Sequence, residues 1–209
     1  PVASPETIKG ADYIGFLRNE ITKRSKYIFF LQGFCGDIRP KMIKKNKNFK
    51  DYLISMIIGH RFRKQFKADA LKIGKKIYNS VKNRKFLYDT IPINHLEKSY
   101  NIKHKVLLDD NIYYSKNLDI TIWNWKQVVL IFINAEVMSG FNIYTFKNKK
   151  VICSGYSNGM LGYIPTEDDI LEGGYEIDKS RKNFKIKNRI NYKNESLIKE
   201  KIKKILHKL

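Results

Sequence analysis

The apolar residues of this chain follow two different periods, and the longer period marks the expected helices. Spacings of three to five residues run through 8–25 and through 51–83. They predict amphipathic helices, and the second helix is either continuous or divided near Gly59. The same pattern covers 194–209, where Asn194 is expected to be the helix N-cap.

Continuous apolar runs, in contrast, are typical of strands that are covered on both faces of a sheet. Such runs stand at 27–31, 128–133 and 151–154. A helix is expected at 136–146, and Pro165 with the acidic residues after it indicates a further helix start. Helix and strand therefore alternate, which predicts a single α/β domain whose mixed sheet of buried strands is flanked by helices.

Composition supports a folded chain and leaves its partners open. Hydrophobic residues make up 43% of the 209 residues, enough apolar surface to offset the entropy cost of ordering the chain. The formal net charge is +21, but Lys outnumbers Arg by 33 to 8. Because bidentate contacts to phosphate favour Arg, a solvated lysine-rich surface is preferred over a nucleic-acid groove. The compartment does not follow from the sequence, because Cys35 and Cys153 can pair in an oxidising compartment or stay reduced. The oligomeric state does not follow from the sequence either.

Three segments share one layout, an apolar run followed at once by a glycine-containing turn with polar side chains. They cover 29–40, 130–140 and 155–166. If the three runs are neighbouring strands, their turns converge at one edge of the sheet, where α/β proteins gather their sites. The sequence therefore predicts a site built from these turns.

These segments, together with Glu172-Gly173-Gly174-Tyr175-Glu176, resemble the neutral, non-lysosomal ceramidase family in kind and in order. That family has a Gln-Gly-x-x-Gly-Asp-x-(Ser or Asn)-Pro loop after a buried strand, and then a Glu after an apolar strand. A Gly-x-x-Asn turn leading to Tyr-(Ile/Val)-x-Thr follows, and then a Tyr-Glu pair. The resemblance covers about residues 8–180, and 181–209 form a lysine-rich C-terminal segment.

The resemblance implies a zinc-dependent hydrolase of linear amides. Glu136 and Tyr163 match the family's carboxylate and phenolate zinc ligands. Asp37 is expected to line the pocket, and Tyr175 is expected to hydrogen-bond near the reacting carbonyl. The implied substrate is an acylated amine or a lipid amide, as in sphingolipid metabolism, with contact to a membrane surface.

Two departures from the family pattern bear on activity. The family's two histidine ligands stand upstream, the second in a His-Pro pair, and Pro1 is expected to be that proline. The chain is therefore expected to be a fragment that is inactive alone. Arg39 stands where the ceramidases proper carry serine, and a guanidinium cannot replace a hydroxyl because it only donates hydrogen bonds. Arg39 can instead hold an anionic substrate group or balance Asp37 and Glu136.

Functions of other classes stay open beside this one. A non-catalytic module would bind anionic lipid, polysaccharide or nucleic acid through its lysines. A degenerate family member is a further alternative. The three histidines His60, His95 and His104 lack the spacing with which one element binds a metal, so each is interpreted as a surface or core residue.

The sequence Gly155-Tyr156-Ser157-Asn158-Gly159 also matches the Gly-x-Ser-x-Gly pattern of a serine-hydrolase elbow. An elbow runs straight into a helix, whereas Gly162 and Pro165 interrupt the residues that follow. The serine-hydrolase interpretation is therefore disfavoured.

Overall fold

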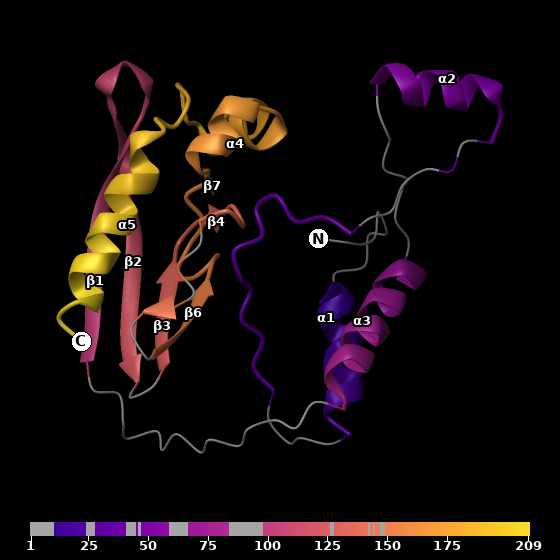
Figure 1. Ribbon diagram of the computed structural model, residues 1–209, viewed down its shortest axis with the longest axis horizontal. Helices are drawn as coiled ribbons and strands as arrows, with labels where there is room; N and C mark the ends of the chain where they lie inside the picture. Colours follow the sequence, from indigo (N-terminus) through magenta and orange to yellow (C-terminus); the bar gives the residue numbers. More distant parts are fainter. Residues whose placement is uncertain are drawn as a thin grey trace. The chain divides into compact units, whose positions relative to one another are not determined.

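The computed structural model describes residues 11–23, 28–40, 45, 47–58, 67–83, 98–125, 128–141, 143, 145–146 and 149–209 (Figure 1). Its contacts divide the chain into two compact units. The first unit contains Pro1–Phe30 and Arg39–Tyr88, and the second contains Leu31–Ile38 and Asp89–Leu209. The expectation of a single domain stays a prediction.

The first unit contains the helices α1 (Asp12–Ile21), α2 (Phe49–Ile58) and α3 (Lys67–Val81). They fall where the helical spacing predicts them. Helices α1 and α3 pack together through Gly74, where a Cβ would lie 2.8 Å from the carbonyl oxygen of Tyr13. Glycine is needed here for close approach of the two backbones.

The second unit is built on a five-stranded mixed sheet in the order β1-β2-β3-β6-β5. Strands β3 and β6 are parallel, and the other neighbours are antiparallel. The sheet confirms the predicted α/β class. The strands are β1 (Lys98–Leu107), β2 (Tyr113–Trp125), β3 (Val128–Ile133), β5 (Thr145–Phe146) and β6 (Lys149–Ser154), and a 3-10 turn, η2 (Asp109–Asn111), joins β1 to β2.

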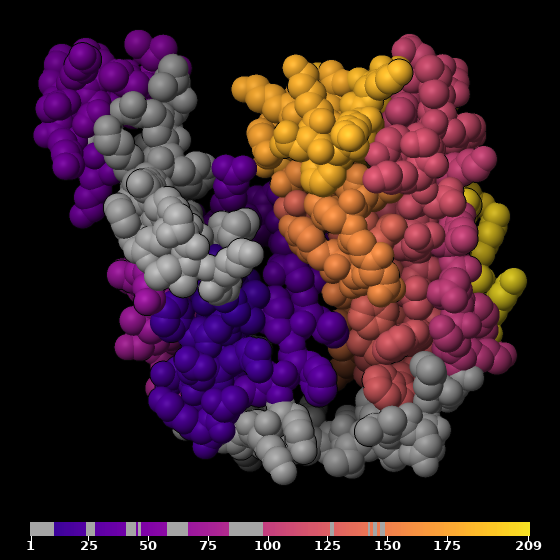
Figure 2. Space-filling view, turned by 180° about the vertical axis from the view of Figure 1, so that it is seen from behind, coloured from indigo at the N-terminus to yellow at the C-terminus, as the bar shows by residue number. Residues whose placement is uncertain are grey.

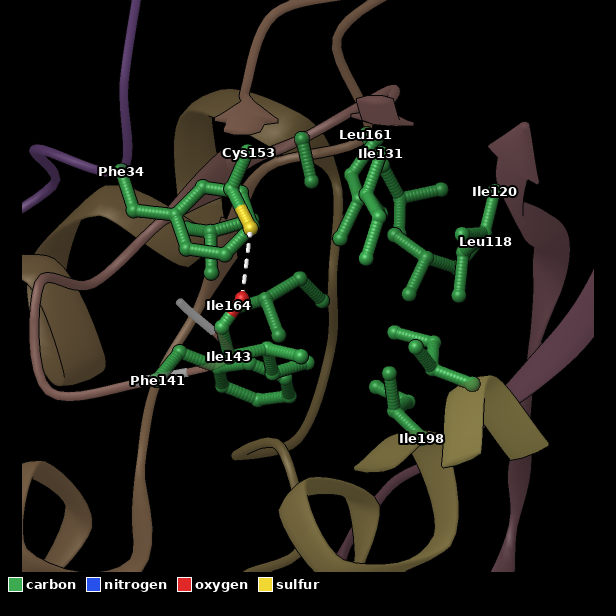
Figure 3. Packing of buried hydrophobic residues seen from close by; sticks show 14 of the residues in the cluster. Phe34, Leu118, Ile120, Ile131, Phe141, Ile143, Cys153, Leu161, Ile164 and Ile198 are labelled. Carbon is green, nitrogen blue, oxygen red and sulfur yellow. Dashed lines mark hydrogen bonds between the residues drawn. The ribbon is translucent and has the colours of Figure 1, made fainter. Parts of the chain in front are cut away.

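The core of the second unit lies between one face of this sheet and α5 (Lys193–Leu206), which runs alongside β1 (Figure 1). Ile198 and Ile202 of α5 are fully buried and share one apolar cluster with the inward residues of β2 and β3 (Figure 3). The lysines of α5 occupy its other face, so the helix is amphipathic as predicted. The predicted buried strands at 128–133 and 151–154 are confirmed as β3 and part of β6.

Asn194 is not the N-cap that the sequence predicts, because α5 begins at Lys193 and its N-cap is Tyr192. Asn194 is 1% exposed, and its amide side chain hydrogen-bonds the edge of β1. Its Oδ1 accepts from the Leu107 amide at 2.8 Å, and its Nδ2 donates to the Leu107 carbonyl at 2.7 Å. Asn194 therefore fixes the start of α5 to the end of β1.

His104 lies beside this anchor and is a core histidine, as expected. It is 3% exposed, and its Nε2 lies 3.1 Å from Asn194 Oδ1. Because an amide oxygen only accepts, Nε2 carries the proton of the neutral ring. Burial lowers the pKa of His104, aided by the charge of Lys201, although the Asn194 bond raises it.

The lowered pKa of His104 predicts a loss of stability in acid. Below the ordinary histidine pKa of about 6.5, the unfolded chain binds a proton that the folded chain resists, so stability falls as the pH falls. Chemical denaturation of the chain and of His104→Gln, at a series of pH values between neutral and acidic, checks this. We expect a smaller acid loss in His104→Gln than in the control His207→Gln, and equal slopes would contradict the prediction.

Two predicted elements are wrong. The run at 27–31 forms no strand over its described residues 28–31, and Phe29 is 91% exposed. The run is divided between the two units, because Phe30 packs edge-on against Tyr13 of α1 and Leu31 begins the second unit. The predicted helix at 136–146 is replaced by β4 (Glu136–Val137), a turn, and β5.

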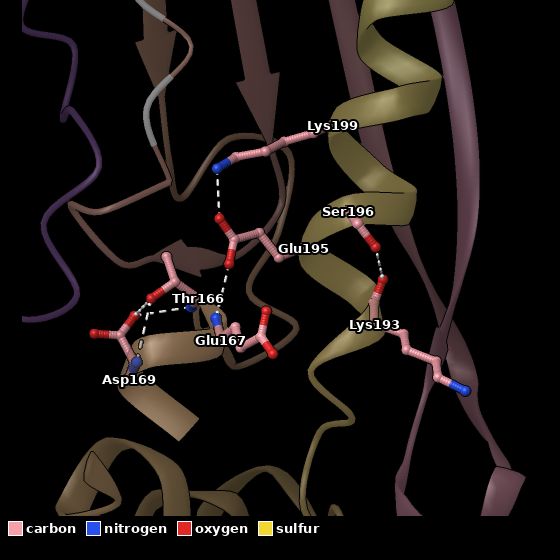
Figure 4. Close-up of polar contacts among 7 residues, drawn as sticks. All are labelled: Thr166, Glu167, Asp169, Lys193, Glu195, Ser196 and Lys199. Atoms are coloured by element: carbon pink, nitrogen blue, oxygen red, sulfur yellow. Dashed lines mark hydrogen bonds and ion pairs between the residues drawn. The ribbon is translucent and has the colours of Figure 1, made fainter. Parts of the chain in front are cut away.

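The predicted helix start after Pro165 is confirmed as α4 (Glu167–Glu172). Thr166 is its N-cap and forms a capping box with Asp169 (Figure 4). The amide of Glu167 also donates to the Glu195 carboxylate of α5 at 2.7 Å, which ties α4 to α5. Among the helices that the structure describes, none combines the length and the apolar character that crossing a bilayer requires.

Candidate functional site

The three predicted polar turns converge in the second unit, although only two of them follow strands. The first turn is held by backbone bonds, since Gln32 O accepts from Gly155 N at 2.9 Å and Gly36 N donates to Val137 O at 3.0 Å. The other two turns are joined by the amide of Tyr156, which donates to Ala135 O at 2.9 Å. The predicted convergence is therefore confirmed.

Glu136 and Tyr163 lie directly opposite each other in a separate pair of parallel strands, β4 and β7 (Tyr163–Ile164). The pair is extended by bonds from Glu136 N to Gly162 O at 2.9 Å and from Met138 N to Ile164 O at 3.1 Å. Opposed residues of neighbouring strands point to the same face. The two expected oxygen ligands are thus neighbours, and their expected role as zinc ligands stays a prediction.

Electrostatics join the two side chains as well. Burial raises the pKa of the Tyr163 phenol, and the charge of Glu136 and hydrogen bonding to its carboxylate raise it further. Glu176 and Tyr175 act on the pKa of the phenol in the same direction. In this environment the Tyr163 phenol stays protonated unless a cation offsets the negative charge that its ionisation would place beside the Glu136 carboxylate.

Tyr156 is a site residue that sequence reasoning missed. Burial raises the pKa of its phenol, and hydrogen bonding to the Glu136 carboxylate adds to the effect. Its backbone has a φ of 55°, in the left-handed region that non-glycine residues rarely adopt, and this conformation costs about 1–3 kcal/mol. Two tyrosines therefore face one carboxylate. The sequence signal was its place in the same turn as Ser157.

Cys35 is the second missed residue. Its thiol accepts a hydrogen bond from Gln32 Nε2 at 3.0 Å, and both cysteines of the chain are free thiols. Burial raises the pKa of Cys35, and the charges of Glu136 and Asp37 raise it further. Hydrogen bonds from Gln32 and Tyr156 lower the pKa but do not outweigh burial. Cys35, Tyr156, Tyr163 and Glu136 form one coupled group, which we call the acidic cluster.

Asp37 holds the first turn in place beside β4. Its carboxylate accepts from the Ser139 amide at 2.7 Å and from the Ser139 hydroxyl at 2.6 Å. Partial burial raises the pKa of Asp37, but the bonds from Ser139 outweigh it and hold the pKa below the ordinary range. The next residue back, Gly36, permits the close fit, because a Cβ there would lie 2.7 Å from the Met138 sulfur and 3.3 Å from the Tyr163 ring.

The remaining two predicted site residues, Tyr175 and Arg39, are not members of the acidic cluster. Tyr175 is 46% exposed and begins η3 (Tyr175–Lys179), with a long contact of 3.5 Å from Asn183 Nδ2 to its hydroxyl. It is near enough to influence Tyr163 electrostatically. Arg39 belongs to the first unit, whereas the cluster belongs to the second, and its expected role stays a prediction.

A small pocket adjoins Tyr163 on the side of η3 and η4 (Ser180–Phe184). The Tyr163 ring meets Phe184 edge-on, with ring centroids 6.4 Å apart. The lining is mostly apolar and includes one carboxylate, Glu176, and one guanidinium, Arg181. The lining residues are Tyr163, Pro165, Glu176, Ile177, Ser180, Arg181, Phe184, Ile186 and Ile190.

Comparison with family models, curated protein sequences and solved structures finds no match for this chain. The likeness to neutral ceramidases therefore rests on the motifs quoted above. Within the described residues, no group of three or more His, Cys, Asp or Glu side chains is arranged to hold a metal ion. Glu136 and Tyr163 supply two oxygen donors, and His60 and His95 lie outside the described residues.

The turn at 155–159 does not have the form of a nucleophile elbow. Residues 158–162 contain no helix, and the element that follows is β7. The Ser157 hydroxyl donates to Gly155 O at 3.1 Å and lies 3.3 Å from Ser154 Oγ. An elbow needs a strand-to-helix turn with an exposed serine beside a base, so this geometry agrees with disfavouring the serine-hydrolase interpretation.

Proposed function

We propose that this chain supplies part of the active site of a zinc-dependent amide hydrolase that resembles the neutral ceramidases. The observation that carries the proposal is the pairing of Glu136 with Tyr163 on two adjacent parallel strands. The order of the motifs singles out these two residues as the oxygen ligands. A small pocket also lies beside Tyr163.

The electrostatics of the acidic cluster support a cation at this place. The ionised Glu136 carboxylate raises the pKa of both Tyr156 and Tyr163, so negative charges there oppose one another. A divalent cation held by Glu136 and Tyr163 would favour the phenolate form of Tyr163. Zinc bound there supplies a Lewis acid that polarises an amide carbonyl and activates water.

The residues of this chain would then have separate tasks. Glu136 and Tyr163 hold the metal, and the two imidazoles that the resemblance implies come from outside the described residues. Asp37 keeps the first turn against β4 through Ser139. Tyr175, which is half-exposed at the start of η3, donates a hydrogen bond to the oxygen of the reacting carbonyl. The substrate class is an acylated amine or a lipid amide.

The proposal predicts a large loss of zinc affinity when either oxygen ligand is removed. In the natural polypeptide that contains residues 1–209, we expect Glu136→Gln and Tyr163→Phe each to weaken zinc binding by at least about tenfold, since even the loss of a residue that hydrogen-bonds a metal ligand costs that much. Zinc content after dialysis against a graded chelator measures this, and release of a fatty acid from an N-acylated amine measures activity. Tyr192→Phe and Glu172→Gln, both exposed, are the matched controls.

Three results would contradict the proposal. The first is equal zinc content in the ligand variants and the controls. The second is stoichiometric, submicromolar zinc binding by residues 1–209 alone, because two oxygen donors hold zinc weakly. The third is strong, salt-sensitive binding of soluble polyanions, nucleic acid or polysaccharide, by a metal-free protein without hydrolytic activity, which would favour the non-catalytic basic module.

A further inference from the structure

Helix α2 presents its apolar residues to solvent. Phe49 is 74% exposed, Met56 is 67% exposed and Ile57 is 82% exposed. Among the side chains of α2 that the structure describes, none is buried. The space-filling view shows this helix, in violet, at the surface of the first unit (Figure 2). Large apolar side chains gathered in this way mark an interaction surface.

The exposed large apolar residues of α2 lie on one face. They stand at positions i, i+3, i+4, i+7 and i+8, which is the spacing of a single helical stripe. Asp51 and Ser55 fall between them and are only partly exposed. This stripe, which we call the α2 face, consists of Phe49, Tyr52, Leu53, Met56 and Ile57.

The start of α2 is fixed by its own residues. Asn48 Oδ1 accepts from the Asp51 amide at 2.8 Å, and Asp51 Oδ2 accepts from the Lys47 amide at 3.3 Å. These bonds satisfy backbone donors at the N-terminus in the manner of a capping box. The rings of Phe49 and Tyr52 stack with centroids 6.4 Å apart. The α2 face is thus held on a formed helix.

Positive charge accompanies the α2 face. Lys45, Lys47 and Lys50 are described and exposed. In the sequence, 41–50 contain five lysines and no acidic residue, and 59–67 contain four further Lys or Arg and no acidic residue. Within α2 the only charged side chains are Lys50 and Asp51. The apolar stripe is therefore flanked by cations along the chain.

We propose that the α2 face docks onto an anionic lipid surface, lying in the plane of the membrane interface. Its 10 residues are too few for the roughly 20 that span a bilayer, so the helix would lie along the interface rather than cross it. Aromatic and aliphatic side chains enter the acyl boundary while the lysines meet lipid phosphates. The exposed lysines Lys45, Lys47 and Lys50 beside the face favour an anionic partner over a neutral apolar protein groove.

This inference is independent of the zinc proposal. Vesicles of phosphatidylcholine alone, and vesicles that also contain phosphatidylserine, are sedimented with the full 209-residue chain. We expect binding to the mixed vesicles only, with an affinity that falls as salt increases.

Ile57→Asp should weaken vesicle binding by about tenfold or more, because it removes an apolar side chain from the membrane interface and adds a negative charge beside anionic lipid. Lys47→Gln should weaken binding by about fivefold, the loss expected for one lysine at the membrane.

Leu171→Asp is the matched control, since Leu171 is 79% exposed on α4 and lies outside the α2 face. It should bind vesicles like the unchanged chain. Circular dichroism shows whether each variant keeps its helices, and Lys47→Gln tests the proposal even if Ile57→Asp unfolds. Unchanged binding in both α2 variants would overturn the inference. The inference would also be overturned if the chain did not bind vesicles and instead self-associated or bound RNA in a way that Ile57→Asp abolishes.

Discussion

Replacing Asn194 with alanine should lower the free energy of unfolding by about 3 kcal/mol or more, because several buried polar groups lose their partners at once. Asn194 is 1% exposed and bonds both the amide and the carbonyl of Leu107. Its Nδ2 also donates to Asn191 O at 2.6 Å, and its Oδ1 lies against His104. Each orphaned buried group costs about 1–3 kcal/mol. Urea denaturation, followed by far-ultraviolet circular dichroism, measures the change.

Asn183→Ala is the control for this experiment, because Asn183 is exposed and its one described side-chain contact is long, at 3.5 Å. We expect a change within about 0.5 kcal/mol for it. Asn194→Asp should also destabilise the chain, since a carboxylate cannot donate to the Leu107 and Asn191 carbonyls. If Asn194→Ala were as stable as Asn183→Ala, α5 would not depend on the β1 anchor.

The elements that local pattern predicts correctly are those whose burial repeats along the chain. Val128–Ile133 forms β3, in which residues of both faces are buried: Val129, Ile131 and Ile133 on one face and Leu130 on the other. The run at 27–31 has the same composition but joins two units, and its described residues pair with no strand. An apolar run predicts that a segment will be buried. Whether the segment forms a strand also depends on a hydrogen-bonding partner strand, which the local sequence does not specify.

The candidate site could be predicted only where its residues share a motif. Glu136 and Tyr163 were singled out by the order of the turns, and the structure places them opposite each other. Tyr156 and Cys35 were missed because their proximity to Glu136 depends on how three turns fold together. The hydrogen bonds from Ser139 to Asp37 join residues that are 102 positions apart in the sequence, so no local sequence pattern predicts them.

Phe141 connects the core to the candidate site, and Phe141→Ala should be strongly destabilising. Phe141 is 0% exposed, and its ring meets Phe34 edge-on with centroids 6.3 Å apart. Truncating a buried phenylalanine costs about 3–5 kcal/mol, from lost burial and the cavity left behind. Phe49→Ala, at a 74% exposed position, is the control and should change stability by at most about 0.5 kcal/mol. Chemical denaturation measures both.

The contact between Phe34 and Phe141 also helps to hold the first turn beside Glu136. Phe34 is 7% exposed and directly precedes Cys35, so its packing anchors the turn from the core side. A double-mutant cycle with Phe34→Ala and Phe141→Ala should give a coupling of about 0.5–1.5 kcal/mol, the range for paired aromatic rings. Because the two rings lie in contact, their separate losses should not simply add. Strict additivity would mean that the turn is held by the Gln32, Gly36 and Asp37 hydrogen bonds alone, and that the core does not position the acidic cluster.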